Sequence, residues 1–159
     1  MHTNQDIKIR KATIKDTKHI KKIVDKFADE EKMLPLSYNQ IYERIRDFWV
    51  IESGKQIIGC GSLKPTWKDL AEIRSLAVKE NFQKMGYGKL LIENILKEGE
   101  QLGFKKIFVL TYKPGYFEKF GFKKISKSKL PHKIWFDCIN CPKFPKCDET
   151  ALIKELIKK

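Results

Sequence analysis

The sequence predicts one domain of the α/β (α+β) class, in which helices cover both faces of a mixed central sheet. Its 159 residues are about the length of one domain. Strand-like and helix-like runs alternate in the order β-α-α-β-β-β-α-β-α-β. A turn at Gly54 joins two β-rich runs as in an antiparallel hairpin, and a glycine-containing turn at 83–89 lies between a strand and a long helix. These observations together favour the mixed sheet.

Two amphipathic helices are expected after a first strand at 7–10. Thr13 is a good N-cap, and Asp16 stands three residues later, as in a capping box. The apolar residues that follow recur at three- and four-residue spacing and share one helix face: Ile20, Ile23, Val24, Phe27 and Ala28. Ser37 and Gln40 cap the second helix in the same way, and it should end near residue 47. The first helix should therefore pack on the sheet.

The rest of the sheet is expected from β-rich runs separated by turn residues. The hairpin consists of 48–52 and 56–63, and a loop at 65–69 follows it. The later elements are a strand at 70–78, a helix at 87–102, a strand at 106–111, a short helix at 116–120 and a strand at 122–125. After a proline- and cysteine-containing loop, Asp148 can cap a C-terminal helix with Leu152, Ile153, Leu156 and Ile157 on its apolar edge.

The charge distribution limits the classes of partner. The net charge is +13, and residues 101–159 alone carry 14 basic and 5 acidic groups. Such a field attracts nucleic acid, a phosphorylated cofactor or a carboxylate substrate, although the lysines can also be merely solvated. Only four of the 33 basic residues are arginines, which disfavours a dedicated nucleic-acid binder.

Nothing in the sequence directs the chain to a membrane or for export. The longest uncharged apolar runs, such as 48–51, are far shorter than the ~20 residues of a membrane-spanning helix. The N-terminus has no apolar segment followed by a small-residue cleavage site. We therefore expect a cytoplasmic protein with no membrane partner.

The turn at 83–89 is the most informative segment. Its residues are Gln83, Lys84, Met85, Gly86, Tyr87, Gly88 and Lys89. Glycines let a backbone approach a ligand, and the free N–H groups at a helix start attract phosphate. The segment is not a Walker loop, because Lys89 is followed by leucine and no glycine stands five residues before Gly88. A plain turn at a helix start is the alternative interpretation.

Three segments in this order resemble the GCN5-related N-acetyltransferase (GNAT) superfamily. They are Ala71-Glu-Ile-Arg-Ser-Leu-Ala-Val78, the turn at 83–89, and Tyr116-Phe-Glu-Lys-Phe-Gly-Phe122. The resemblance covers roughly residues 7–125. It implies a GNAT fold with a splayed cofactor cleft, an N-acetyltransferase domain at 1–128, and an appended loop and helix at 129–159.

Within the superfamily, the sequence is most similar to short amino-acid N-acetyltransferases like N-acetylglutamate synthase. The similarity rests on Glu-Ile-Arg-Ser-Leu-Ala-Val, on Val109-Leu-Thr111 and on the tail Leu-Pro-x-Lys-x-Trp-x-Asp-Cys. Those relatives carry Leu-Pro-Arg-Ser before the second helix, whereas this chain has Leu34-Pro-Leu36-Ser37. One cation that could bind a substrate carboxylate is therefore missing.

The resemblance implies acetyl-CoA as co-substrate. Its pantetheine would bond backbone groups of Leu76, Ala77 and Val78, and its diphosphate would lie on N–H groups of residues 83–89. Phe117 stands at the position where many family members have a tyrosine, and we expect it beside the cofactor. CoA alone could explain the lysine-rich field.

The resemblance also suggests the groups that perform acetyl transfer. Glu72 matches the strand carboxylate that acts as base, although pairing with Arg74 on the same strand face is the alternative. A backbone N–H at a bulge near Leu76 or Ala77 would hold the oxyanion. Tyr116 is the candidate acid for the leaving thiolate, with packing on the cofactor as its other role.

Three further candidates concern the acceptor. Arg74 and Lys133 are the cations expected near a substrate carboxylate, with surface ion pairing as the alternative. Trp135 would wall the acceptor pocket or pack in the core.

The cysteines suggest a structural metal site. Cys138, Cys141 and Cys147 form a C-x₂-C-x₅-C pattern that can bind zinc if His132, Asp148 or Cys60 supplies a fourth ligand. Reduced thiols and a disulfide are the alternatives, and a reducing cytoplasm disfavours the disulfide. Cys60 itself is expected to be a small buried group of a strand.

The sequence thus predicts an enzyme that transfers acetyl from acetyl-CoA to the primary amine of a small amino acid, with glutamate favoured. An acetyltransferase acting on proteins or peptides is one alternative. A non-catalytic module that senses CoA or binds nucleic acid is the other. The expected partner is a small-molecule amine, and a homodimer is the assembly to test.

Overall fold

The computed structural model describes residues 6–130 and 149–156. Its strands are β1 (Ile7–Lys11), β2 (Phe48–Ser53), β3 (Gln56–Trp67), β4 (Leu70–Val78), β5 (Lys106–Thr111), β6 (Lys123–Ile125) and β7 (Thr150–Glu155). Its α-helices are α1 (Thr17–Asp29), α2 (Tyr38–Glu43), α3 (Tyr87–Leu102) and α4 (Pro114–Glu118). Short 3₁₀ turns are η1 (Ile14–Asp16), η2 (Ile45–Asp47), η3 (Glu80–Phe82) and η4 (Lys127–Lys129).

The described strands form one mixed sheet of seven strands in the order β1-β2-β3-β4-β5-β7-β6. β4 and β5 are parallel, and their register runs from Leu70 opposite Lys106 to Glu72 opposite Phe108. The pairs β1–β2, β2–β3, β5–β7 and β6–β7 are antiparallel. The expected mixed sheet is therefore confirmed.

The chain divides into two compact units, and both β3 and β4 contribute to each of them. Unit 1 consists of residues 1–63 and 73–97, and unit 2 of residues 64–72 and 98–159. These bounds do not follow the division at residue 128 that the sequence suggested, so that division stays a prediction.

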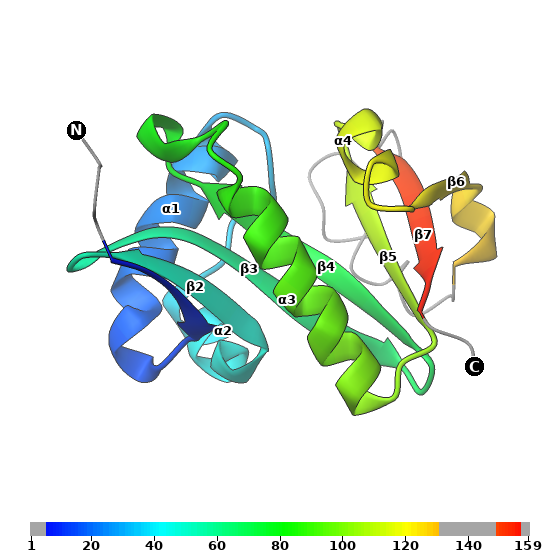
Figure 1. Cartoon of the computed structure of the whole chain (residues 1–159), viewed down its shortest axis with the longest axis horizontal. Coiled ribbons are helices and arrows are strands. Elements are labelled where there is room, and N and C mark those ends of the chain that lie inside the picture. The colour runs from blue at the N-terminus through cyan, green and yellow to red at the C-terminus, as the bar shows by residue number, and fades with distance from the viewer. Residues whose placement is uncertain (1–5, 131–148, 157–159) are drawn as a thin grey trace. The chain divides into compact units, whose positions relative to one another are not determined.

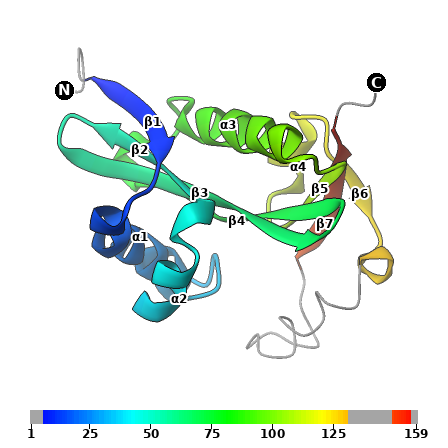
Figure 2. The ribbon, with the colours of Figure 1, turned by 90° about the horizontal axis from the view of Figure 1, so that it is seen from below.

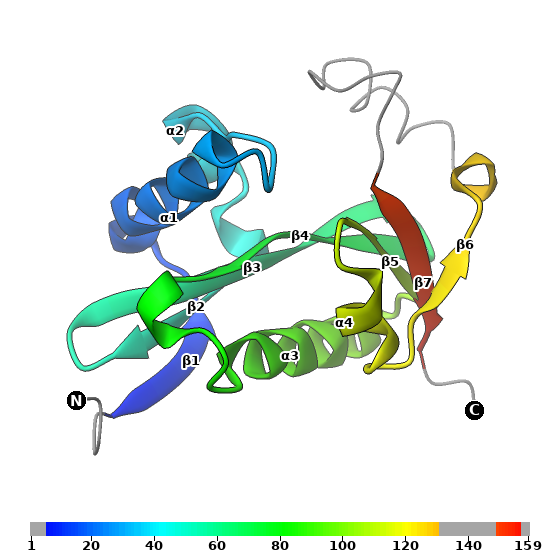
Figure 3. The same cartoon turned by 90° about the horizontal axis from the view of Figure 1, so that it is seen from above.

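In unit 1, helices cover both faces of the strands. α1 and α2 lie on one face of β2 and β3, and α3 lies on the other (Figures 2 and 3). The expected capping box of α2 is present, because Ser37 Oγ accepts from Gln40 N at 3.1 Å and Gln40 Oε1 accepts from Ser37 N at 2.8 Å. The chain enters α1 through Asp16, which accepts from Thr13 N at 2.7 Å.

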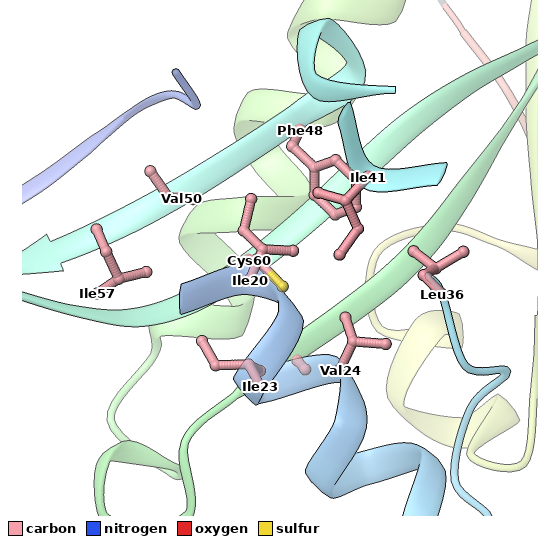
Figure 4. Close-up of a cluster of buried hydrophobic side chains, with 10 residues drawn as sticks. Ile20, Ile23, Val24, Leu36, Ile41, Phe48, Val50, Ile57 and Cys60 are labelled. Atoms are coloured by element: carbon pink, nitrogen blue, oxygen red, sulfur yellow. The ribbon is translucent and has the colours of Figure 1, made fainter. Parts of the chain in front are cut away.

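Each face of unit 1 has its own apolar cluster. Beneath α1 and α2, the cluster includes Ile20, Ile23, Val24, Leu36, Ile41, Phe48, Val50, Ile57, Cys60 and Ala77 (Figure 4). Beneath α3, it includes Ile51, Ile58, Phe82 and Leu91. Burying each isoleucine, leucine, valine or phenylalanine side chain contributes roughly 1.5–3 kcal/mol, so both faces stabilise β3 and the second half of β4.

In unit 2, β7 pairs with β5 on one side and with β6 on the other. Leu70, Phe108, Leu130 and Ala151 form one buried apolar cluster of this unit. α4 lies beside β5 and β7 (Figure 1). The backbone N–H groups of Lys105 and Lys106 both donate to Asp69 O at 3.1 Å, which fixes the start of β5 against the start of β4.

The expected C-terminal helix is wrong. Residues 150–155 form β7, which pairs with β5 at six positions and with β6 at three. Leu152 is fully buried opposite Val109, so the apolar edge expected on a helix is a strand face instead. The loop expected at 65–69 is also shorter, since β3 continues to Trp67.

Candidate active site

β4 changes its backbone conformation within unit 1. Ser75 has a φ of +55°, in the left-handed region that a non-glycine residue of a strand rarely occupies. Beyond it, Ala77 packs into the cluster beneath α1, while Leu76 and Val78 pack into the cluster beneath α3. Because these side chains pack in the core, a ligand can contact this part of β4 through its backbone N–H and C=O groups.

The loop between β4 and α3 contains two residues with left-handed backbone. Lys84 has a φ of +65° and Gly86 a φ of +88°. Successive N–H groups in turns of this kind can face one side, an arrangement that binds anions. A Cβ placed on Gly86 would meet nothing within 4 Å, so the backbone here is open to a ligand.

The start of α3 follows this loop directly. The first N–H groups of a helix have no intrahelical acceptor and carry the positive end of the helix dipole. Leu90 N donates to Gly86 O at 3.2 Å, so the donors ahead of it, from Tyr87 to Lys89, belong to that first turn. Tyr87 packs against the cluster beneath α3 and thereby fixes the helix start. This arrangement suits a phosphate or diphosphate.

The backbone N–H of Gln83 was expected to hold the diphosphate, but it has a partner within the chain. Its backbone N–H donates to Glu80 O at 3.3 Å, and its side-chain Nε2 donates to Val78 O at 2.8 Å. Gln83 therefore closes the η3 turn on the end of β4. The side chains of Lys84, Met85 and Lys89 are exposed around the loop.

The remaining described candidates, apart from Arg74, lie in unit 2. Glu72 is buried, with 8% of its surface exposed, and stands opposite Phe108 at the end of the β4–β5 register. Phe117 is buried in edge-to-face contact with Phe122, the ring centres being 5.6 Å apart. Tyr116 packs edge-on against Phe117 and Phe120 at 5.4 Å, and burial raises the pKa of its hydroxyl. A protonated Tyr116 is what an acid requires.

Arg74 lies half-buried in the unit 1 part of β4. The other acceptor candidates, Lys133 and Trp135, fall outside the described residues, as do Cys138, Cys141 and Cys147. Residues 6–130 and 149–156 contain no group of three or more ligands that could hold a metal ion. The zinc site thus stays a prediction from the sequence.

Cys60 is fully buried, as expected, and burial raises the pKa of its thiol to about 12. It is therefore a thiol at working pH. Its position in the core beneath α1 makes it unsuitable as a fourth metal ligand.

Sequence reasoning missed a cavity of about 260 Å³ in unit 1. Six residues line it: Lys26, Phe27, Glu30, Lys32, Glu80 and Gln83. The Glu30 carboxylate forms ion pairs with Lys32 at 3.0 Å and with Lys26 at 3.3 Å. The charges that line the cavity are therefore largely neutralised within the chain. The Lys26–Glu30 spacing of four residues predicts the ion pair, but only the fold brings Gln83 to it.

Comparison with known proteins decides the family. Residues 15–122 match the acetyltransferase (GNAT) family. The chain belongs to this family. This acetyltransferase is 43% identical over 151 residues to an uncharacterized N-acetyltransferase of Chlorobaculum tepidum, covering 95% of this chain and 97% of that protein. It is 31% identical over 131 residues to the amino-acid acetyltransferase of Mycobacterium tuberculosis, covering 80% and 74%.

Two solved structures resemble this acetyltransferase closely. N-acetylglutamate synthase from Neisseria gonorrhoeae, complexed with coenzyme A and N-acetyl-glutamate, gives a TM-score of 0.88 at 25% identity. The match covers 96% of this chain and 36% of that one. A Mycobacterium tuberculosis protein complexed with CoA gives 0.82 at 25% identity, covering 94% and 99%. The GNAT fold and the acetyltransferase class are thus established, and helices long and apolar enough to cross a membrane are absent from the described residues.

Proposed function

We propose that this acetyltransferase transfers acetyl from acetyl-CoA to the primary amine of a small amino acid, with glutamate favoured. The observation that carries the proposal is the loop with left-handed backbone at Lys84 and Gly86, directly before the start of α3, which suits the diphosphate of CoA. The amino-acid acetyltransferase of M. tuberculosis and the gonococcal synthase crystallised with CoA and N-acetyl-glutamate support the substrate class.

The cofactor is held mainly by backbone groups. The amides from Lys84 to Lys89 receive the diphosphate, and the backbone of Leu76 to Val78 bonds the pantetheine. The side chains of Lys84 and Lys89 are exposed beside the loop and add positive charge for an anionic ligand.

Acetyl transfer requires a neutral amine, stabilisation of an oxyanion and a leaving thiolate. Glu72 takes a proton from the acceptor ammonium, and the amine nitrogen then attacks the thioester carbonyl. A backbone N–H of Leu76 or Ala77 stabilises the resulting oxyanion. The C–S bond then breaks and Tyr116 donates a proton to the leaving sulfur, while the nitrogen of the new amide releases its second proton to water, which reprotonates Tyr116.

Recognition of the acceptor carboxylate falls to Arg74 and Lys133, with Trp135 beside the acceptor. Leu36, at the position where similar enzymes carry arginine, is only 6% exposed and packs in the core beneath α1. An apolar core residue cannot bind a carboxylate, so a cation elsewhere must supply this contact.

A thiol-release assay with acetyl-CoA tests the proposal. Free amino acids, polyamines and peptides are offered as acceptors, each at the same concentration. The expected result is release with amino acids, greatest with glutamate. Release with peptides or polyamines alone would contradict the proposed substrate class.

Glu72→Gln tests the proposed base. It should leave acetyl-CoA affinity unchanged and lower turnover at neutral pH by at least tenfold, since a positioned base contributes ~10²–10⁴-fold. Glu93→Gln, the same chemical change on an exposed residue of α3, is the matched control. Equal turnover of the two variants would remove Glu72 from the catalytic role.

A further inference from the structure

The strained backbone of β4 needs a physical cause. Glu31, Ser75 and Lys84 are the described non-glycine residues with positive φ, and of these Ser75 alone lies in a strand. Such a conformation persists only where the surrounding structure over-determines it. The residues that hold Ser75 should therefore be found in the strand that pairs with it.

Two side chains of β3 bind the carbonyl groups at this point of β4. Ser62 Oγ donates to Arg74 O at 3.0 Å, and Cys60 Sγ donates to Ser75 O at 3.4 Å. Cys60 and Ser62 are two residues apart, so they lie on the same face of β3. The two donor residues are buried, at 0% and 5% exposure. Two successive carbonyls are thus anchored from one side.

The opposite face of β3 has glycines at two positions, 59 and 61. A Cβ on Gly61 would lie 2.9 Å from Leu76 Cδ1 and 3.2 Å from Ile95 Cδ1. A Cβ on Gly59 would lie 3.3 Å from Ala77 O. These positions therefore leave room for the residues of β4 that follow Ser75. The segment Gly59-Cys-Gly-Ser62 bonds β4 on one face and accommodates it on the other.

We propose that Cys60 and Ser62 are positioning residues of the acetyltransferase. They hold the bend at Ser75 and thereby direct the backbone N–H groups of β4 that face away from β3, those of Leu76 and Val78, toward the thioester. This inference rests on the proposed function of those N–H groups. An irregular residue in a strand redirects the backbone that follows it, so losing the anchors misdirects the donors without removing them.

Paired substitutions distinguish the effect of losing the hydrogen bond from the effect of changed packing. Ser62→Ala and Cys60→Ala remove each donor, whereas Ser62→Thr and Cys60→Ser keep one. Ile57→Val trims the same core cluster beneath α1 without touching Ser75 and is the packing control. The two pairs are independent, so the test survives if one alanine variant fails to fold.

The first measurement is amide hydrogen exchange of the protein without ligand. Exchange at Leu76, Ala77 and Val78 should become roughly tenfold faster in Ser62→Ala and in Cys60→Ala. It should be close to the parent value in Ser62→Thr, Cys60→Ser and Ile57→Val. Equal exchange in the alanine variants and in Ile57→Val would overturn the proposal.

The second measurement separates kcat from KM. In Ser62→Ala, kcat should fall about tenfold or more, because small misplacements of reacting groups cost up to ~10²-fold. KM for acetyl-CoA should change less than kcat, since the loop at 83–89 is intact, and Ser62→Thr should restore kcat. Faster exchange with an unchanged kcat would mean that Cys60 and Ser62 do hold the bend at Ser75. It would overturn the proposed role of the β4 amides in catalysis.

Discussion

Asp16 links the end of β1 to the start of α1. Its carboxylate accepts from Arg10 Nη1 at 2.8 Å and Nη2 at 3.0 Å, and from Thr13 N at 2.7 Å. Burial alone would raise the pKa of Asp16, but the hydrogen bonds from Arg10 and Thr13 outweigh it and lower the pKa. The ionised form is therefore the one that stabilises the fold.

Asp16→Asn should lower the free energy of unfolding at pH 7 by about 2 kcal/mol, the size of a hydrogen bond to a charged group. A lowered native pKa gives stability that is fully present above the unfolded value of about 3.9 and is lost as pH falls through the native pKa. The difference in free energy of unfolding between the parent and Asp16→Asn should thus shrink below pH 4. Urea unfolding at several pH values measures this difference.

Glu30→Gln provides the control for Asp16. Glu30 binds Lys26 and Lys32 on the surface, with 40% of its side chain exposed, and such pairs contribute little. It should change stability much less than Asp16→Asn. An Asp16→Asn effect that stays constant from pH 7 to pH 3 would show that the carboxylate charge is not responsible.

α3 is an element with a left-handed glycine at each end. Gly86 precedes it with a φ of +88°, and Gly103 follows it with a φ of +95°. A Cβ at either position would meet nothing within 4 Å. The two sites therefore impose the same backbone strain, but only Gly86 adjoins the proposed diphosphate site.

Gly86→Ala should raise the Kd for CoA about tenfold, which corresponds to ~1.4 kcal/mol. Alanine disfavours positive φ by roughly 1–2 kcal/mol, so the N–H groups of the loop lose their common direction. Gly103→Ala should reduce stability similarly and leave the Kd unchanged. Calorimetric titration measures the Kd for CoA of both variants. Equal Kd values would contradict the proposal that the loop at 83–89 binds the diphosphate.

At the scale of the whole molecule, the net charge of +13 acts on any anionic ligand. CoA carries its charges on phosphates, whereas pantetheine has the same thiol arm without them. The Debye length falls from about 10 Å at 0.1 M salt to 3 Å at 1 M, so distant lysines are screened.

The affinity for CoA should therefore fall severalfold between 0.05 and 0.5 M salt, while the weaker affinity for pantetheine stays nearly constant. Calorimetric titration at the two salt concentrations provides the comparison. A CoA affinity independent of salt would mean that the lysines are solvated and take no part in binding.

Much of the fold followed from local signals in the sequence. Capping by Ser37 and Gln40, the apolar stripe of α1 and the turn at Gly54 depend on residues within a few positions of one another, so the sequence alone determined them. The turn at 83–89 likewise indicated an anion site before its backbone angles were known.

Pairing between distant residues decided the rest. Residues 150–155 satisfy a helical pattern locally, yet the ladder with β5 and β6 makes them β7, because strand stability depends on partners far along the chain. The bend at Ser75 and its anchors at Cys60 and Ser62 lie 12 or more residues apart, so only the tertiary structure shows them. The sequence alone determined the family, the local elements and the anion-binding turn, whereas the fold decided which buried side chains shape the backbone beside that turn.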